Sequence, residues 1–280
     1  MIPIKISNIN ILASEHARLL LENYKADLNV DELDRLLTPY SFNQVLVAKP
    51  AELREIIDTI RKRPYDKVFS SLLKVYKKFA KWEGGKYCAE KLLKNLGLTV
   101  CPYCNRTYIH SIDEKKARVC QIDHFFNKKD YPYLALSFYN LIPSCYACNH
   151  TKSTRSIGLS PYEITNSNIV AFSYNHTSIS NIDVTLSTEN EEMKTNIKEL
   201  GLDSLYKNHN DYVGELIDKR RIYSDAYLKE LEANFGDIVE SKEKLLRLIA
   251  GNYIEEDDLK KRPLAKMTRD IMMQLGFIEE

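Results

Sequence analysis

Two short stretches, Cys101-Pro-Tyr-Cys104 and Cys145-Tyr-Ala-Cys148, decide how the middle of this chain folds. In each stretch two residues separate the cysteines, a spacing that lets one turn of chain direct both sulfurs to a single ion. Four cysteine thiolates bind zinc tetrahedrally and leave no coordination position open, so we expect a structural Zn²⁺ site. The alternatives are four free buried cysteines or a redox pair, and the repeated spacing argues against both.

The 40 residues between the two stretches, 105 to 144, exceed the roughly 15–20 that an ordinary four-cysteine zinc module encloses. The extra length indicates that the cysteine frame carries a second site. Three polar motifs lie inside this frame or directly after it: Gln121-Ile-Asp123-His124-Phe-Phe, Phe138-Tyr-Asn140-Leu-Ile-Pro143 and Asn149-His150-Thr-Lys152.

In order and spacing, these motifs resemble the HNH nuclease family. That family has an Asp-His or His-His pair, a central Asn followed by Leu or Ile, and a closing His or Asn, often framed by two CxxC pairs. Cys-Pro-Tyr-Cys-Asn at 101–105, Asp-His-Phe-Phe at 123–126 and Tyr-Pro-Tyr-Leu-Ala-Leu-Ser-Phe-Tyr-Asn-Leu-Ile-Pro-Ser-Cys at 131–145 resemble more narrowly the HNH subunit of the Septu anti-phage system. Relatives of that subunit accompany some retrons. The resemblance covers about residues 101–155.

The resemblance implies an α+β fold that is mostly α-helical, with a central ββα-metal unit held by the four-cysteine zinc site. Such a unit is a two-stranded hairpin followed by a helix, and it binds one divalent ion. The implied activity is that of a Mg²⁺- or Mn²⁺-dependent endonuclease in anti-phage defence, associated with an ATPase subunit of the ABC or SMC-like type. We expect DNA as the substrate and keep RNA as the alternative, because the chemistry requires no particular sugar.

The chemistry of phosphodiester cleavage calls for the same residue types. It needs a base that activates water and a cation that neutralises charge developing on the phosphate. His124 is suited to be the base, because an unperturbed imidazole has a pKa near 6.5. Asp123 and Asn149 offer the hard oxygen ligands that Mg²⁺ prefers. His150 is the alternative to Asn149 as the closing ligand, and the resemblance favours Asn149, because the closing ligand of the HNH family directly follows the last cysteine.

Three further roles follow from the resemblance alone. Asn140 would hold the loop that orients His124, without touching the metal. Lys152 and Arg155 would contact neighbouring phosphates from a helix that leaves the site. Many family members have Pro three residues after the catalytic His, whereas this chain has Asn127 there, which removes no chemical group.

The composition is that of an ordinary soluble globular protein, with 44% hydrophobic and 28% charged residues. We expect a cytoplasmic location, because no apolar run approaches the roughly 18 residues of a membrane span and residues 1–12 lack a signal-peptide pattern. A reducing compartment also argues against pairing the six cysteines as disulfides. We therefore interpret Cys88 and Cys120 as buried apolar residues.

The net charge of +1 hides an asymmetry along the chain. Residues 1–160 carry 25 Lys and Arg against 16 Asp and Glu, a net charge of +9, and residues 161–280 carry 15 against 23, a net charge of −8. This pattern is compatible with nucleic acid on one face and another partner elsewhere. Solvated helical surfaces explain it equally well.

Hydrophobic spacing predicts a three-part organisation, with an N-terminal helical domain over 1–99, the zinc-stapled core over 100–160 and a C-terminal region over 161–280. Helices are expected over 52–60, 68–79 and 88–96, the last ending at Gly97. Short strands are expected over 169–174 and 182–186. Helical periodicity then returns over 205–231, 241–251 and 264–275.

The main alternative to a nuclease is a zinc-stabilised nucleic-acid or protein binding module without activity. It is distinguished by His124 and Asn149, since a scaffold has no chemical need for both. The flanks, far longer than an isolated HNH unit needs, are expected to dock an ATPase; the alternative is that they form the chain's own core or a homodimer.

Overall fold

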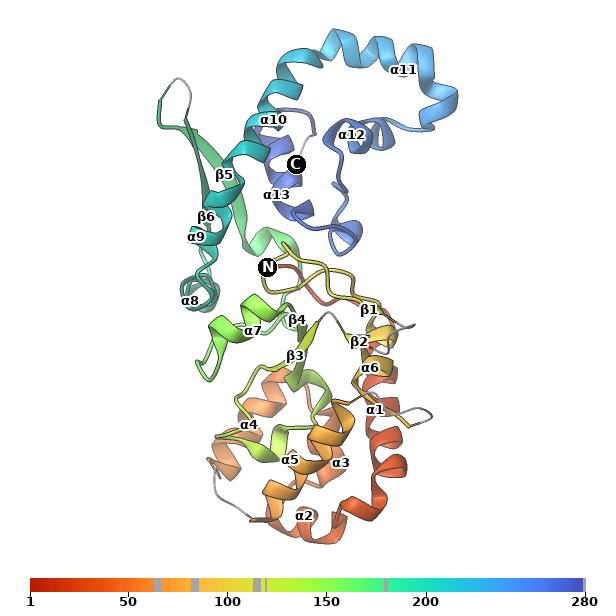
Figure 1. Ribbon diagram of the computed structural model, residues 1–280, viewed down its shortest axis with the longest axis vertical. Helices are drawn as coiled ribbons and strands as arrows, with labels where there is room; N and C mark the ends of the chain where they lie inside the picture. Colours follow the sequence, from red (N-terminus) through yellow and green to blue (C-terminus); the bar gives the residue numbers. More distant parts are fainter. Residues whose placement is uncertain (63–66, 82–85, 113–116, 119, 179–180, 279–280) are drawn as a thin grey trace.

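The computed structural model of the protein is mostly helical, with three separate two-stranded antiparallel sheets among the described residues (Figure 1). The structure describes residues 1–62, 67–81, 86–112, 117–118, 120–178 and 181–278. This composition confirms a mixed α+β fold dominated by helix. Among the described residues, no helix combines the length and apolar character needed to cross a bilayer.

The N-terminal segment is a group of helices in the lower half of the molecule, at one end of the central strands (Figure 1). All three helices expected here are confirmed, and α6 ends at Gly97, whose φ of 60° is accessible to glycine without strain. A capping box between Ser41 and Gln44 starts α3. The helices are α1 (Ile9–Asn23), α2 (Val30–Leu37), α3 (Phe42–Val47), α4 (Pro50–Ile60), α5 (Lys67–Phe79) and α6 (Ala89–Leu96), with a 3₁₀ turn at Lys25–Asp27.

The central segment contains two small sheets and one short helix. Strand β3 (Gln121–His124) pairs antiparallel with β4 (Leu141–Ser144), so that Asp123 lies opposite Ile142 and His124 opposite Leu141. Helix α7 (Tyr146–Lys152) starts directly after β4. This order of hairpin and helix places the end of β3 beside α7. The remaining elements of the segment are β1 (Ser111–Ile112), β2 (Ala117–Arg118) and the 3₁₀ turns Pro132–Leu134 and Phe138–Asn140.

The C-terminal segment combines a hairpin with six helices. The two expected strands pair as β5 and β6, and α12 begins after the N-cap Ser241 and ends at Gly251, as expected. The periodic run over 205–231 is divided, because Ser224 caps a new helix. The elements are β5 (Ala171–His176), β6 (Ile182–Ser187), α8 (Glu191–Leu200), α9 (Leu202–Tyr206), α10 (Asn210–Ile222), α11 (Asp225–Val239), α12 (Lys242–Ala250) and α13 (Ala265–Gln274), with 3₁₀ turns at Ser167–Ile169, Lys207–His209 and Glu256–Asp258.

A single cluster of buried apolar side chains includes residues from all three segments, from Met1 to Phe277. Met267 and Met272 belong to it and are fully buried, a common role for the flexible methionine side chain, which fills irregular gaps in cores. Strands β3 and β4 lie between the N-terminal helices and the C-terminal region (Figure 1).

His16 joins α1 to the loop before β4. It is buried, and its Nε2 lies 2.8 Å from the carbonyl oxygen of Leu136 while its Nδ1 lies 2.8 Å from the hydroxyl of Tyr87. A carbonyl can only accept, so Nε2 carries the proton and Nδ1 accepts from Tyr87. Burial lowers the pKa of His16 from 6.5 to about 4, and the imidazole is neutral in the folded protein.

The stability of the fold is expected to depend on His16 below neutral pH. The folded protein disfavours the protonated imidazole, so this contribution is complete above pH 6.5 and is lost as the pH falls towards 4. The shift corresponds to about 3 kcal/mol of unfolding free energy. Urea unfolding at a series of pH values between 6.5 and 4 should show a smaller decline in the free energy of unfolding for His16→Gln than for the wild type. Equal declines in the two proteins would contradict this role.

Candidate functional site

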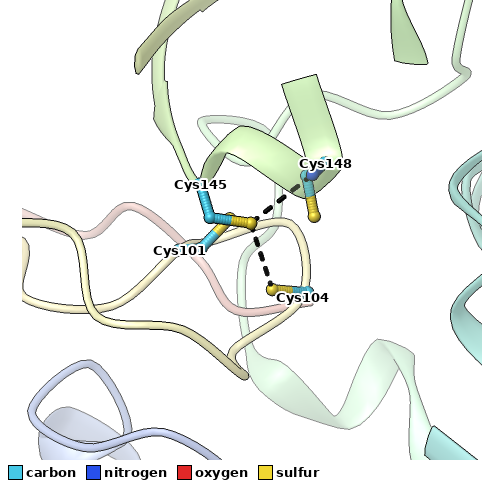
Figure 2. A group of neighbouring side chains, drawn as sticks. All are labelled: Cys101, Cys104, Cys145 and Cys148. Carbon is cyan, nitrogen blue, oxygen red and sulfur yellow. Dashed lines mark hydrogen bonds between the residues drawn. The ribbon is translucent and has the colours of Figure 1, made fainter. Parts of the chain in front are cut away.

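The four cysteines of the two CxxC stretches converge on one buried cluster (Figure 2). Cys101 and Cys104 come from the loop before β1, Cys145 lies between β4 and α7 as the N-cap of that helix, and Cys148 lies in α7. The four sulfurs lie within 4.8 Å of one another, and those of Cys104 and Cys145 are 3.9 Å apart. A tetrahedral zinc with bonds of about 2.3 Å needs sulfurs about 3.8 Å apart. The cluster could therefore hold a metal ion such as zinc.

The charges of the cluster also fit a bound dication. Hydrogen bonds from Cys101, Cys104 and Cys148 lower the pKa of Cys145, whose sulfur also accepts the backbone N–H of Cys148 as the N-cap of α7. Burial raises the pKa of Cys101. Four thiolates in one buried space would repel one another, and a divalent cation between them would remove that repulsion.

The loop of the first CxxC stretch also anchors the C-terminal region. Asn105 is fully buried with a φ of 50°, which turns the chain back so that its backbone N–H bonds the Cys101 carbonyl at 2.7 Å. Its side chain donates to the Leu259 carbonyl and accepts from the backbone N–H of Lys266. The position of α13 thus depends on the order of this cysteine loop.

Asp123 lies in β3, and its side chain is buried between the cysteine loop and α7. The hydroxyl of Tyr103 donates to Asp123 Oδ2 at 2.8 Å, and the ammonium of Lys152 lies 3.1 Å from the same oxygen. Burial raises the pKa of Asp123, while Lys152 and Tyr103 oppose that rise. Tyr103, which lies between the first two cysteines, therefore orients this carboxylate.

His124 follows Asp123, and its ring is held from both nitrogens. Nε2 lies 3.0 Å from the carbonyl oxygen of Ala135 and must carry the proton, so Nδ1 carries the lone pair and can accept. The ammonium of Lys128 lies 3.3 Å from Nδ1. Burial, followed by the charge of Lys128, holds the pKa of His124 well below 6.5. The imidazole is therefore neutral near pH 7.

Asn140 positions the loop that contacts His124. Its Oδ1 accepts from the Phe126 backbone N–H at 2.7 Å, and its Nδ2 donates to the carbonyls of Phe126 and Leu134, at 3.2 and 2.9 Å. Leu134 immediately precedes Ala135, whose carbonyl binds His124. Asn140 is fully buried and acts on His124 through this loop.

Asp123, His124 and Asn149 line one cleft of about 280 Å³. The Nδ2 of Asn149 donates to the side chain of Gln121, so its amide faces β3, on the side where Asp123 lies. His150 lies on the exposed face of α7. The cleft is lined by residues of β3, the loop after it and α7: Gln121, Ile122, Asp123, His124, Asn127, Lys128, Lys129, Tyr146, Asn149, His150, Ser153 and Thr154.

Lys152 does not lie where a surface phosphate contact would be expected. Its side chain is fully buried, and its ammonium donates to the His124 carbonyl at 2.7 Å as well as to Asp123. The cause is the helical period, since Lys152 follows Cys148 by four residues on the inner face of α7. Arg155 is exposed, and its guanidinium lies 3.5 Å from Glu199.

Tyr103 and Lys128 are the site residues that were not predicted. Tyr103 lies inside the first CxxC stretch, whose spacing predicts a function only for the cysteines, and Lys128 follows His124 by four residues in an irregular loop. Neither position has a pattern that points to Asp123 or His124. Cys88 and Cys120 are buried outside the cysteine cluster, as expected.

No family model matches the chain, and neither a curated protein nor a solved structure matches it.

Proposed function

We propose that this chain is a metal-dependent endonuclease of the HNH type that hydrolyses phosphodiester bonds, with DNA as the favoured substrate. The observation that supports this most is the shared cleft at the end of a hairpin and the start of a helix. It brings together the carboxylate of Asp123, the neutral imidazole of His124 and the amide of Asn149. These are the groups that the resemblance to HNH nucleases implies.

Asp123 and Asn149 are the residues that would hold a catalytic Mg²⁺ or Mn²⁺. The fit rests on their donor atoms, because a carboxylate and an amide oxygen are hard ligands and both line the same cleft. A bound cation would neutralise charge developing on the phosphate and the leaving oxygen. His150 is the weaker candidate, since its ring stacks against Tyr146 on the exposed face of α7.

His124 is proposed as the general base. Its Nδ1 takes a proton from the attacking water, which replaces the Lys128 ammonium beside this nitrogen, while the bond from Nε2 to Ala135 keeps the ring in place and stabilises the imidazolium. The water oxygen bonds to phosphorus as the bond to the leaving oxygen breaks, and solvent protonates that oxygen. Arg155 remains a proposed phosphate contact, whereas Lys152 is proposed to position Asp123.

The decisive test is cleavage of single-stranded DNA and of plasmid DNA in Mg²⁺ or Mn²⁺ by the wild type and by His124→Ala. Loss of a general base typically costs 10²–10⁴ in rate, so we expect at least about a hundredfold loss of cleavage. Zinc content should be unchanged. His110→Ala is the matched control, because His110 is exposed and lies outside the cleft. A His124→Ala protein that cuts as well as the wild type would refute the proposal.

We also propose an ATPase partner of the ABC or SMC-like type, which would direct the nuclease. The exposed apolar side chains of the C-terminal helices support a docking role for that flank. Co-purification from the native operon should recover an ATPase, and recovery of the chain alone would count against it. Of the large hydrophobic side chains exposed in the described part of the chain, this flank holds Ile222, Tyr227, Phe235, Ile238 and Leu248.

One observation favours a second candidate, a zinc-stabilised binding module without catalytic activity. The ammonium of Lys152 already balances the charge of Asp123, which a catalytic cation would otherwise do. A protein that binds zinc and nucleic acid, but cuts neither DNA nor RNA in any divalent cation, would establish this alternative.

A further inference from the structure

A stacked pair of rings borders the cleft. Tyr146 and His150 lie one helical turn apart on α7, with ring centroids 5.5 Å apart and planes only 9° from parallel. Both residues line the cleft that contains His124. Tyr146 is nevertheless 63% exposed, so most of its ring remains open to a ligand. His150 supports the tyrosine from one side.

The position of Tyr146 is fixed by the cysteine cluster. It directly follows Cys145, which caps α7 through the Cys148 backbone N–H. The anchored helix fixes the backbone of Tyr146, and the stack against His150 restricts its ring, so less rotamer freedom is lost when a ligand stacks on it. The pair is therefore built as a rigid platform, whereas an ordinary surface tyrosine would lose rotamer freedom on binding.

The loop after β3 carries cations beside the same cleft. Lys129 is exposed, and Lys128 places its ammonium 3.3 Å from His124 Nδ1. Both lysines line the cleft together with Tyr146. An aromatic platform beside lysines is the combination with which proteins bind single-stranded nucleic acid, since bases stack on the ring and the cations contact the backbone.

We propose that Tyr146, supported by His150, stacks an unpaired nucleobase next to the phosphate held at His124, and that the substrate is therefore single-stranded nucleic acid or an unpaired segment of it. This inference rests on the proposed nuclease function and deepens it. A base inside a duplex has both faces covered by its neighbours, so only an unpaired or displaced base can occupy the platform.

The test uses binding without added divalent cation, so that it does not depend on cleavage. A short DNA strand containing 2-aminopurine is titrated with the protein, alone and annealed to its complement. We expect tighter binding and fluorescence quenching of the single strand by the wild type and by Tyr146→Phe. Tyr146→Leu should bind the single strand on the order of tenfold more weakly. Zinc content and thermal midpoint check that the variants fold.

Tyr227→Leu is the matched control. Tyr227 is 41% exposed and stacks on Tyr223 in the same manner, with planes 14° apart, but it lies on α11 and outside the cleft. Its loss should not change binding. Equal binding by wild type and Tyr146→Leu would overturn the platform, and duplex binding as tight as single-strand binding would overturn the substrate class. Absence of cleavage in Mg²⁺ or Mn²⁺ is a separate result that bears on the nuclease proposal.

Discussion

A Cys148→Ser variant is expected to lose its metal and most of the order around the cysteine cluster. Serine is a poor zinc ligand, and three thiolates would remain in a buried space shaped for four ligands. Structural zinc contributes on the order of 10 kcal/mol to the folding of small zinc-binding units. That figure is comparable with the whole stability of an ordinary domain, about 5–15 kcal/mol.

The loss of order should extend beyond the four cysteines, because three contacts to other parts of the chain come from the cysteines or from residues next to them. Tyr103 orients Asp123 from within the first CxxC stretch. Cys145 caps α7, which carries Asn149. Asn105 ties the same loop to α13. The cleft and the C-terminal region should therefore both become less ordered when zinc is lost.

Zinc content by atomic emission and the thermal midpoint measure the effect. Wild-type protein should contain one zinc per chain and lose stability on prolonged chelation. Cys88→Ala is the matched control, since Cys88 is buried to the same degree but lies outside the cluster. It should keep its zinc and show at most a small loss of stability. Zinc in Cys148→Ser at the wild-type level would disprove the structural role.

The parts of the fold that could be predicted are those with local causes. Gly97, Ser241 and Gly251 mark helix ends through their own backbone and capping preferences, and the structure ends or starts helices at each of them. In the β5–β6 hairpin, apolar and polar residues alternate along both strands, which is typical of a half-buried strand. The cysteine cluster was predictable because its spacing alone favours a single ion.

The contacts within the site could not be predicted to the same degree, because they join distant segments. The pairing of β3 with β4 involves four residues on each side, and β4 is buried throughout, so no alternation signals it. The bond from Tyr103 to Asp123 exists only once the two segments have packed. Lys152 was wrongly predicted to contact phosphate, although its spacing of four residues from Cys148 is a signal that could have placed it on the inner face of α7.

Lys152→Met is expected to destabilise the protein by about 3–5 kcal/mol, the usual cost of leaving one partner of a buried ion pair without the other. The ammonium is fully buried and lies 3.1 Å from Asp123 Oδ2 and 2.7 Å from the His124 carbonyl. Methionine preserves the length of the side chain but donates no hydrogen bond. The charge of Asp123 would then be stabilised by the hydroxyl of Tyr103 and by the more distant charge of Lys128.

Two further variants distinguish the effect of losing the buried charge from the effect of changing the shape of the side chain. Asp123→Asn combined with Lys152→Met removes both charges, so it should recover much of the stability that the single change loses. Lys194→Met is the matched control, because Lys194 contacts Glu191 at 2.7 Å with both side chains largely exposed. Its unfolding free energy should change by less than about 1 kcal/mol.

Urea unfolding of the wild type and four variants at neutral pH decides the matter: Lys152→Met, Asp123→Asn, the double variant and Lys194→Met. A Lys152→Met loss no larger than that of Lys194→Met would mean that the buried ammonium does not stabilise Asp123. A double variant as unstable as the sum of its single changes would mean that the two side chains are independent. The expected non-additivity would instead show that Lys152 and Asp123 act as one unit, and it would explain why the cleft can keep a carboxylate buried.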